Sequence, residues 1–269
     1  MDNKLQKCLV SLSFDDGRID NYTMAYPILK KIDLPATFNI TMGYVTGKLT
    51  PGNPTDVKQM NVDMVRELFS NNKFEIAGHG WAHQNDITDI EKGITELKSL
   101  LGVNTLTRFG DGFASPGTGL SLETWHRLTS NQSNTIRYAR VSLRYKSCAW
   151  LKTLIRKTSR VLQWPCLYRM AYQDTMMNDV QDGLIYSIPV LSSITTNELK
   201  DVIKKAIKTK QAIVLMFHSI VPNGAVHDNW DYEEGKFDTF CQFLKQEEKE
   251  GKLKVCTSME VWKQLTSEK

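Results

Sequence analysis

The sequence has no long hydrophobic run, and this absence excludes a helix that crosses a membrane. Such a helix needs about 20 apolar residues in succession, and no run of about 18 occurs in the 269 residues. The first residues, Met1 to Lys4, lead almost directly into a strand-like segment without the apolar stretch of a signal peptide. We therefore expect a cytoplasmic protein.

The chain also has few cysteines and a small net charge. The five cysteines are widely spaced and form no CxxC pair, which argues against a disulfide framework and against a cysteine zinc site. A net charge of +4 is too small to imply a nucleic-acid partner. With 41% hydrophobic and 24% charged residues, the composition is that of a globular chain, not a disordered one.

Strand-like and helical patterns alternate along the chain, which predicts a parallel α/β sheet, either open or closed into a barrel. We expect one domain over residues 1–269. The predicted strands are residues 8–14, 35–40, 74–77, 112–114, 135–141, 184–190, 212–217 and 253–257. The predicted helices are residues 20–32, 62–70, 86–101, 120–128, 196–208, 237–250 and 259–265.

One segment, at about 141–175, interrupts this alternation and reads as a basic insertion. Residues 140–173 contain no acid, and tryptophan and leucine lie among their basic residues. We interpret the segment as an inserted helical excursion with a solvated basic face. The alternative is a surface patch for an anionic membrane or an acidic polymer. The eight basic residues are Arg140, Arg144, Lys146, Lys152, Arg156, Lys157, Arg160 and Arg169.

Two adjacent carboxylates follow the first predicted strand. The apolar run ends in Asp15 and Asp16, with Gly17 behind them. Adjacent carboxylates repel each other, so a cation beside them helps to keep both ionised. The glycine allows a sharp turn or the close approach of a ligand. The pattern suits a metal-assisted site, although an ordinary Asp-Gly turn has the same letters.

Two of the five histidines follow the third predicted strand. His79 and His83 would share one face if residues 79–83 formed a helical turn, and both could then bind one metal ion. Neutral imidazole is a favoured zinc ligand, and a carboxylate completes a set of three. A capping histidine or a buried core histidine is the alternative for either residue.

A third histidine, His218, directly follows the apolar strand 212–217. The C-terminal ends of parallel strands lie at one face of a sheet or barrel, where ligands bind. The paired carboxylates and the three histidines should therefore meet in space. Each could separately be a turn or loop residue, but their common placement favours a metal site.

Four motifs in this order resemble those of the polysaccharide deacetylase (NodB-homology) family of carbohydrate esterases. They are SFDDG (13–17), GHGWAH (78–83), FASPGTG (113–119) and LMFHS (215–219), with PATF (35–38) between the first two. The resemblance extends from roughly Leu9 to Trp262. It implies a distorted, TIM-like (β/α)7 barrel, one divalent metal ion, most often zinc, and hydrolysis of an N-acetyl or, less often, an O-acetyl group on an amino sugar.

The resemblance also implies a role for each matching residue. Asp16, His79 and His83 would bind the metal ion. Asp15 would be the general base for a metal-bound water, and His218 the general acid that protonates the leaving amine. A bound zinc ion brings the pKa of water to about 7, so that a carboxylate can complete the deprotonation. An amine leaves readily only once it is protonated, which requires the acid.

Two positions depart from the family pattern. Ala114 stands where the third motif usually has the arginine that orients the general base. We expect Arg140 to replace it, with Arg137 and Arg18 as further candidates. The aspartate that normally supports the acid histidine is not recognisable, and Asp182 is our candidate.

Four residues are expected to contact the substrate: Pro116, Met216, Trp81 and Trp230. Met216 would line the pocket for the acetyl methyl group, as the resemblance implies. The tryptophans could stack on sugar rings or could be packing residues. Residues 46–54 and 223–232 should edge the groove.

The resemblance leaves three hypotheses for function. The first is a metal-dependent deacetylase of an amino-sugar polymer, oligosaccharide or precursor, with membrane contact through the basic segment at about 141–175. The second is a carbohydrate-binding protein that keeps the barrel but has lost efficient catalysis, which Ala114 suggests. The third is an amidase that acts on a substrate other than a sugar.

Overall fold

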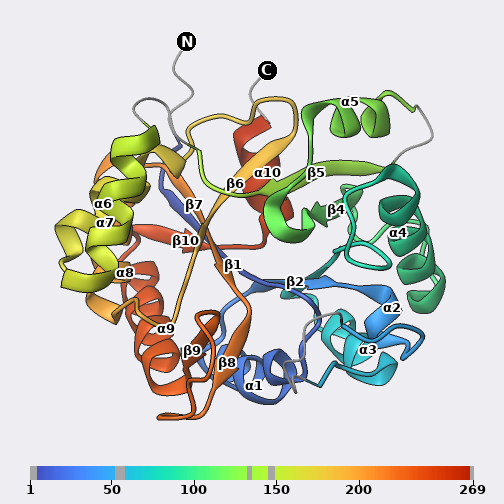
Figure 1. Ribbon diagram of the computed structural model, residues 1–269, viewed down its shortest axis with the longest axis horizontal. Helices are drawn as coiled ribbons and strands as arrows, with labels where there is room; N and C mark the ends of the chain where they lie inside the picture. The colour runs from blue at the N-terminus through green and yellow to red at the C-terminus, as the bar shows by residue number, and fades with distance from the viewer. Residues whose placement is uncertain (1–4, 52–57, 132–134, 145–148, 267–269) are drawn as a thin grey trace.

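The computed structural model describes residues 5–51, 58–131, 135–144 and 149–266. Seven parallel strands form a closed barrel in the order β1-β2-β3-β4-β5-β6-β7, and β7 pairs with β1 to close it (Figure 1). The predicted (β/α)7 barrel is therefore confirmed. Its strands are β1 (Cys8–Phe14), β2 (Ala36–Ile40), β3 (Phe74–Gly78), β4 (Asp111–Ala114), β5 (Ile136–Val141), β6 (Leu184–Pro189) and β7 (Ala212–Phe217).

The barrel is distorted where its ends meet. β1 pairs with β7 from Leu9 to Phe14, but it pairs with β2 only through Ser13 and Phe14. The other half of that edge, Cys8 to Val10, pairs with β10 (Leu253–Val255), an eighth parallel strand. The first half of this edge of β1 thus pairs with β10, and its C-terminal end pairs with β2.

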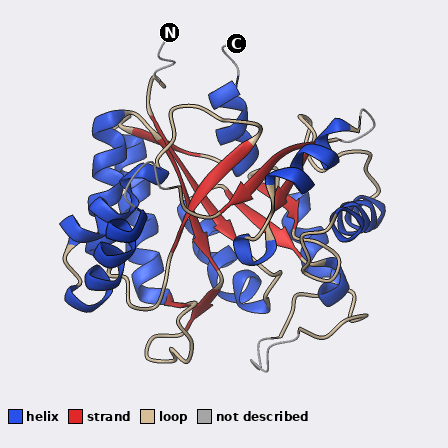
Figure 2. Ribbon diagram, turned by 45° about the horizontal axis from the view of Figure 1, so that its top comes forward, coloured by secondary structure: helices blue, strands red, loops and turns tan. Residues whose placement is uncertain are grey.

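Helices surround the barrel because each parallel strand is followed by a crossover connection (Figure 2). A short π-helix, η1 (Asn21–Ala25), runs into α1. The α-helices are α1 (Tyr26–Ile32), α2 (Met42–Val45), α3 (Val62–Ser70), α4 (Ile87–Leu101), α5 (Leu122–Ser130), α6 (Ala149–Leu162), α7 (Pro165–Tyr172), α8 (Thr196–Thr209), α9 (Glu234–Lys249) and α10 (Ser258–Thr266). Two 3₁₀ turns, η2 (Pro116–Thr118) and η3 (Gln173–Thr175), and the strand pair β8 (Ser219–Val221) and β9 (Asp231–Glu233) complete the described elements.

Aromatic rings near the C-terminal end of β1 fix the packing below the site. The Phe14 ring stacks on Phe38 of β2 at 5.2 Å between ring centroids and on Phe217 of β7 at 5.4 Å. Phe237 of α9 meets the Phe14 ring edge-on at 5.7 Å. All four are fully buried. Since Phe14 and Phe217 each precede a candidate catalytic residue, this cluster anchors two parts of the site in one packed layer.

The basic insertion is helical, as expected. α6 and α7 pack against each other, and α7 packs against α8 at the left edge of Figure 1. Lys146 lies outside the described residues. Across the described ranges, no helix combines the length and apolar character needed to cross a membrane.

Candidate metal and catalytic site

The end of β1 delivers both carboxylates. The backbone N–H of Asp15 still donates to the Phe217 carbonyl of β7 at 3.0 Å, so this residue is held in the plane of the barrel wall. Asp16 and Gly17 then adopt left-handed backbone angles, with φ of 72° and 73°. A non-glycine residue in this region is uncommon and is found where function requires it. The sharp turn directs the carboxylate of Asp16 towards the loop after β3.

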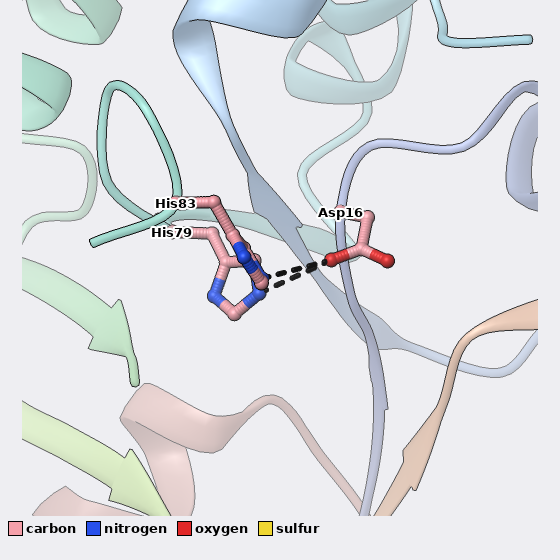
Figure 3. Close-up of side chains that lie close together, drawn as sticks. All are labelled: Asp16, His79 and His83. Carbon is pink, nitrogen blue, oxygen red and sulfur yellow. Dashed lines mark ion pairs between the residues drawn. The ribbon is translucent and has the colours of Figure 1, made fainter. Parts of the chain in front are cut away.

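Asp16, His79 and His83 form the three-ligand group that the sequence predicts (Figure 3). Oδ1 of Asp16 lies 3.3 Å from Nε2 of His79 and 3.4 Å from Nε2 of His83. All three ligand atoms lie within 4.8 Å of one another. Two imidazole nitrogens and one carboxylate oxygen form a donor set that suits zinc and leaves positions open for water and substrate. These residues therefore fit a single divalent cation.

Neighbouring groups orient each ligand. Nδ1 of His79 lies 2.8 Å from the carbonyl oxygen of Ala114, which can only accept a hydrogen bond, so Nδ1 is the donor and Nε2 keeps its lone pair for a metal ion. Arg18 donates from Nε to Oδ2 of Asp16 at 3.0 Å and leaves Oδ1 facing the imidazoles. Burial alone would raise the pKa of Asp16, but its hydrogen bonds to the two histidines hold that pKa well below the ordinary value.

Residues 79–83 do not form the helical turn that would place both histidines on one face. These residues form an irregular loop, in which Gly80 and His83 have positive φ values of 80° and 61°. Asp89 of α4 organises this loop. Its buried carboxylate accepts hydrogen bonds from the backbone N–H groups of Trp81, Ala82 and Gln84, at 2.7–3.0 Å. A loop held by a buried carboxylate, instead of a helix, brings the two imidazoles together.

Asp15 is almost fully buried and is held from two sides. Nη2 of Arg140 lies 2.6 Å from its Oδ2, and Nδ2 of Asn39 donates to its Oδ1 at 2.7 Å. Burial alone would raise the pKa of Asp15, but the positive charge of Arg140, with contributions from two nearby histidines, outweighs it and lowers the pKa below its ordinary value. The carboxylate is therefore ionised and fixed in orientation at neutral pH.

Arg140 thus occupies the place expected for it beside Asp15, whereas the two further candidates do not. Arg18 pairs with Asp16, as described above. Arg137 is exposed and donates to the carbonyl of Phe109 at 3.3 Å. Asn39 was missed, although a lone asparagine inside the apolar strand β2 was a signal that a buried polar partner would be present.

His218, at the end of β7, faces Asp15 with its Nε2 atom 4.0 Å from Oδ2. The Trp230 ring packs on the imidazole at 4.4 Å between centroids. Among the described residues, no hydrogen-bond partner reaches the buried Nδ1 of His218. Asp182 is not that partner, because it is exposed and contacts His126 at 3.9 Å. Burial lowers the pKa of His218 below its ordinary value, although the two aspartates oppose this shift.

These groups line a cavity of about 530 Å³ at the C-terminal end of the barrel. Met216 and Trp230 are part of its wall, and so are Pro51 and Asp228 from the two predicted edge segments. Pro54, at the end of the first edge segment, lies outside the described residues. Two of the residues predicted to contact the substrate, Pro116 and Trp81, do not line this cavity. Pro116 is buried, and its neighbours Ser115, Gly117 and Thr118 line the cavity instead.

Trp81 is the second of these two residues. Its ring is 8% exposed and belongs to the hydrophobic core cluster. Nζ of Lys92 lies 4.0 Å from the ring centroid, and Lys48 also approaches the ring. Trp81 therefore packs in the core and does not form part of the cavity wall.

Residues 2–110 match the sequence model of the polysaccharide deacetylase family. This part of the chain is similar to the polysaccharide deacetylase family. The matched segment includes Asp15, Asp16, His79 and His83, whereas Arg140 and His218 lie beyond it. No curated protein sequence gives a significant match.

Solved structures of deacetylases share the barrel fold. The chain is similar to a protein assigned as a polysaccharide deacetylase from Mycobacterium smegmatis, with 13% identity, a TM-score of 0.57 and coverage of 99% of this chain and 92% of that one. The peptidoglycan N-acetylglucosamine deacetylase Bc1960 gives 16% identity, a TM-score of 0.54 and coverage of 96% and 90%. BA3943 from Bacillus anthracis is a CE4 family pseudoenzyme, and the structure of a mutant with restored activity is also similar. It gives 18% identity, a TM-score of 0.50 and coverage of 96% of this chain and 68% of that one.

The chain spans only part of two other similar proteins, 57% of IcaB from Ammonifex degensii and 54% of the deacetylase PplD from Streptococcus pyogenes. Both are aligned over about half of the present chain, 48% and 49%, with TM-scores of 0.39.

A larger cavity, of about 880 Å³, lies at the opposite end of the barrel. It is bordered by Phe74 at the start of β3 and by Val255 of β10. The buried carboxylate beside it, Glu75, is already bonded to Thr37, Tyr138 and the Met259 backbone. Among the described residues, only the smaller cavity has a three-ligand group of this kind. Chemistry, not size, therefore identifies the candidate site.

Proposed function

We propose that this protein is a metal-dependent hydrolase that removes an N-acetyl, or less often an O-acetyl, group from an amino sugar in a polysaccharide or its precursor. The family supports the deacetylation of a sugar polymer. The observation that carries the finer proposal is the convergence of Asp16, His79 and His83 beside the buried, ionised Asp15.

A divalent cation, with zinc the best match to the donor set, would be held by Asp16, His79 and His83. When bound there, it would lower the pKa of water and polarise the acetyl carbonyl. The chain's own part is to present Oδ1 of Asp16 and Nε2 of each histidine to a common centre, which Arg18 and the Ala114 carbonyl support from outside.

Asp15 is the proposed general base. Its carboxylate borders the cavity and is ionised at neutral pH, so it can accept the proton of the attacking water. Arg140 and Asn39 occupy one oxygen each and prevent the side chain from rotating away. Fixing the base in this way removes part of the entropic cost of the reaction.

His218 is the proposed general acid. When its Nε2 atom carries a proton, it can donate that proton to the leaving nitrogen as the bond between acetyl carbon and nitrogen breaks. The released products are then acetate and a free amine. The position of His218 next to Asp15, and its contact with Trp230, keep it at the reacting centre.

The walls of the cavity favour a sugar substrate. Met216 offers a small apolar surface for the acetyl methyl group, and Trp230 offers a partly exposed ring near the point where a sugar would lie. Aromatic faces and a few fixed polar groups are typical of such sites. One similar structure, Bc1960, is named as an N-acetylglucosamine deacetylase, which is in line with this substrate class.

A second candidate function is sugar binding without efficient catalysis. Two observations favour it: the lack of a partner for Nδ1 of His218 among the described residues, and the similarity to a family pseudoenzyme. This alternative predicts that oligosaccharides bind in the cavity but are not deacetylated.

The test is acetate release from N-acetylglucosamine oligomers by zinc-loaded protein. We expect turnover by the wild type and a loss of about a hundredfold or more in kcat for Asp15→Asn, which is the scale of a missing general base. Asp63→Asn is the control, because Asp63 is an exposed residue of α3 that does not line the cavity, so its loss should not change the rate. No acetate from the wild type, or equal rates for Asp15→Asn, would contradict the proposal. Binding without turnover would support the second candidate.

A further inference from the structure

α6 carries its apolar side chains on its outer face. Trp150, Leu154 and Val161 are exposed by 73%, 54% and 82%. They are four and seven residues apart, so they form one stripe along the helix. Leu151 and Leu162 flank the stripe, and Trp164 follows the end of the helix with 56% of its surface exposed. A continuous exposed apolar stripe on one helix is unusual for a protein surface that contacts only water.

The inner face of the same helix is polar. Ser159 is fully buried, and Nζ of Lys152 donates to the Met170 carbonyl of α7 at 2.7 Å and pairs with Asp174 at 3.6 Å. Ile155 alone of the aliphatic residues on α6 packs against the main core. An ordinary surface helix has the reverse arrangement, with its apolar side inward. The pattern of α6 is therefore explained only if a partner covers its outer face.

The charge of α6 indicates what that partner is. The helix contains four basic residues and no acid. The ion pairs of this segment join Lys152 to Asp174 and Arg169 to Asp201. Among the described residues, Arg156, Lys157 and Arg160 form no ion pair with a carboxylate. Lys157 is exposed on the same side as the apolar stripe. A cationic helix with leucine, valine and tryptophan on its free side is typical of helices that lie in the headgroup layer of a membrane.

The tryptophans support a lipid surface over a protein groove. Trp150 and Trp164 stand near the two ends of the stripe, and tryptophan is enriched at the boundary between lipid headgroups and acyl chains. Basic residues near such a stripe gain further affinity from anionic lipids. We propose that α6 docks this protein on an anionic lipid bilayer, with Trp150, Leu154 and Val161 inserted below the headgroups.

This docking is independent of the deacetylase chemistry. None of the stripe residues lines the cavity of the candidate site. The membrane contact would hold the barrel at a lipid surface and raise the local concentration of substrates attached to lipid. Failure of the docking would leave acetate release from soluble oligomers unchanged, so the two proposals can be separated.

The test is co-sedimentation with vesicles of phosphatidylcholine alone and of phosphatidylcholine mixed with phosphatidylglycerol. We expect the wild type to bind the anionic vesicles more tightly, with weaker binding at high salt because the charges are screened. The double variant Leu154→Glu/Val161→Glu should bind about tenfold more weakly or worse, since it loses two apolar contacts. Leu122→Glu is the matched control, because Leu122 of α5 is 55% exposed but lies outside the stripe.

Three results would overturn the inference. The wild type could fail to bind anionic vesicles, the double variant could bind as well as the wild type, or Leu122→Glu could lose as much binding as the double variant. A wild type that forms dimers in light scattering, lost in the double variant, together with no vesicle binding, would assign the stripe to a second copy of the chain instead. Far-UV circular dichroism of each variant checks that it is folded.

Discussion

At the scale of single residues, the two proposed proton-transfer groups differ in how their surroundings stabilise the charged form. Asp15 has a partner on each carboxylate oxygen, and its charged form is stabilised. His218 has a ring contact with Trp230, but its Nδ1 atom has no hydrogen-bond partner among the described residues. Burial therefore disfavours the imidazolium form that a general acid needs, and this imbalance has a measurable effect on activity.

We expect kcat/KM to fall as the pH rises through the neutral range. The pKa of His218 is lowered below its ordinary value of 6.5, so protonated His218 becomes scarce as the pH rises towards 7 and beyond. Asp15 has a lowered pKa and stays ionised throughout this range, so the base does not limit the rate. The pH profile should be measured with zinc in excess, since low pH also protonates metal ligands.

The variant His218→Asn provides the control for this profile. Without an imidazole at this position, the residual rate should lose the decline with rising pH. A wild-type rate that increases steadily with pH across the neutral range, or a variant with the same falling profile, would contradict the role of His218 as the acid.

At the scale of elements, the decisive unit is the loop from His79 to Asn85 together with the first turn of α4. Asp86 caps α4 by accepting from the Asp89 backbone N–H at 2.9 Å, and Asp89 then accepts three backbone N–H groups of the loop. Gly93, one turn further along α4, lets the helix approach the loop, because a Cβ atom there would lie 2.5 Å from the backbone of Gly80. The position of both histidines thus depends on the N-terminal part of α4.

Asp89→Asn should weaken zinc binding by about ten- to a hundredfold, the usual effect of losing a group that orients metal ligands. The amide has one acceptor oxygen instead of two, so the loop loses part of its backbone bonding. The dissociation constant can be measured by competition with a chelating dye. Asp63→Asn, a substitution in the first turn of α3, should leave the constant unchanged. Equal zinc affinity for Asp89→Asn and the wild type would show that Asp89 does not organise the site.

The alternation of strands and helices was predictable from the sequence because buried strands have continuous apolar runs and the helices have clear apolar faces. The elements that were missed lack such patterns. α2 is only four residues long, and β8 and β9 have three residues each. The spacing of the two histidines is compatible with a helical turn at 79–83, but the backbone there follows the carboxylate of Asp89. The sequence gives no local signal for that contact.

At the scale of the whole molecule, the site exists because the barrel closes. Asp15 and Asp16 come from β1, the two histidines from the loop after β3, Arg140 from β5 and His218 from the end of β7. Parallel strands place all these groups at one end of the barrel, so their convergence was predictable once a parallel sheet was inferred. The sequence could not settle which arginine pairs with which carboxylate, because Arg18 and Arg140 both lie near the two aspartates. The structure pairs Arg18 with Asp16 and Arg140 with Asp15.

The most direct test of the central claim is a zinc titration of metal-free protein by isothermal calorimetry. One zinc ion per chain is expected. Asp16→Asn should weaken its binding by at least about a hundredfold, because losing a ligand should cost more than losing an orienting group. Asp15→Asn, which alters the adjacent carboxylate, should keep the stoichiometry and most of the affinity. Zinc binding that is absent in the wild type, or that is retained in full by Asp16→Asn, would contradict a metal site formed by Asp16, His79 and His83.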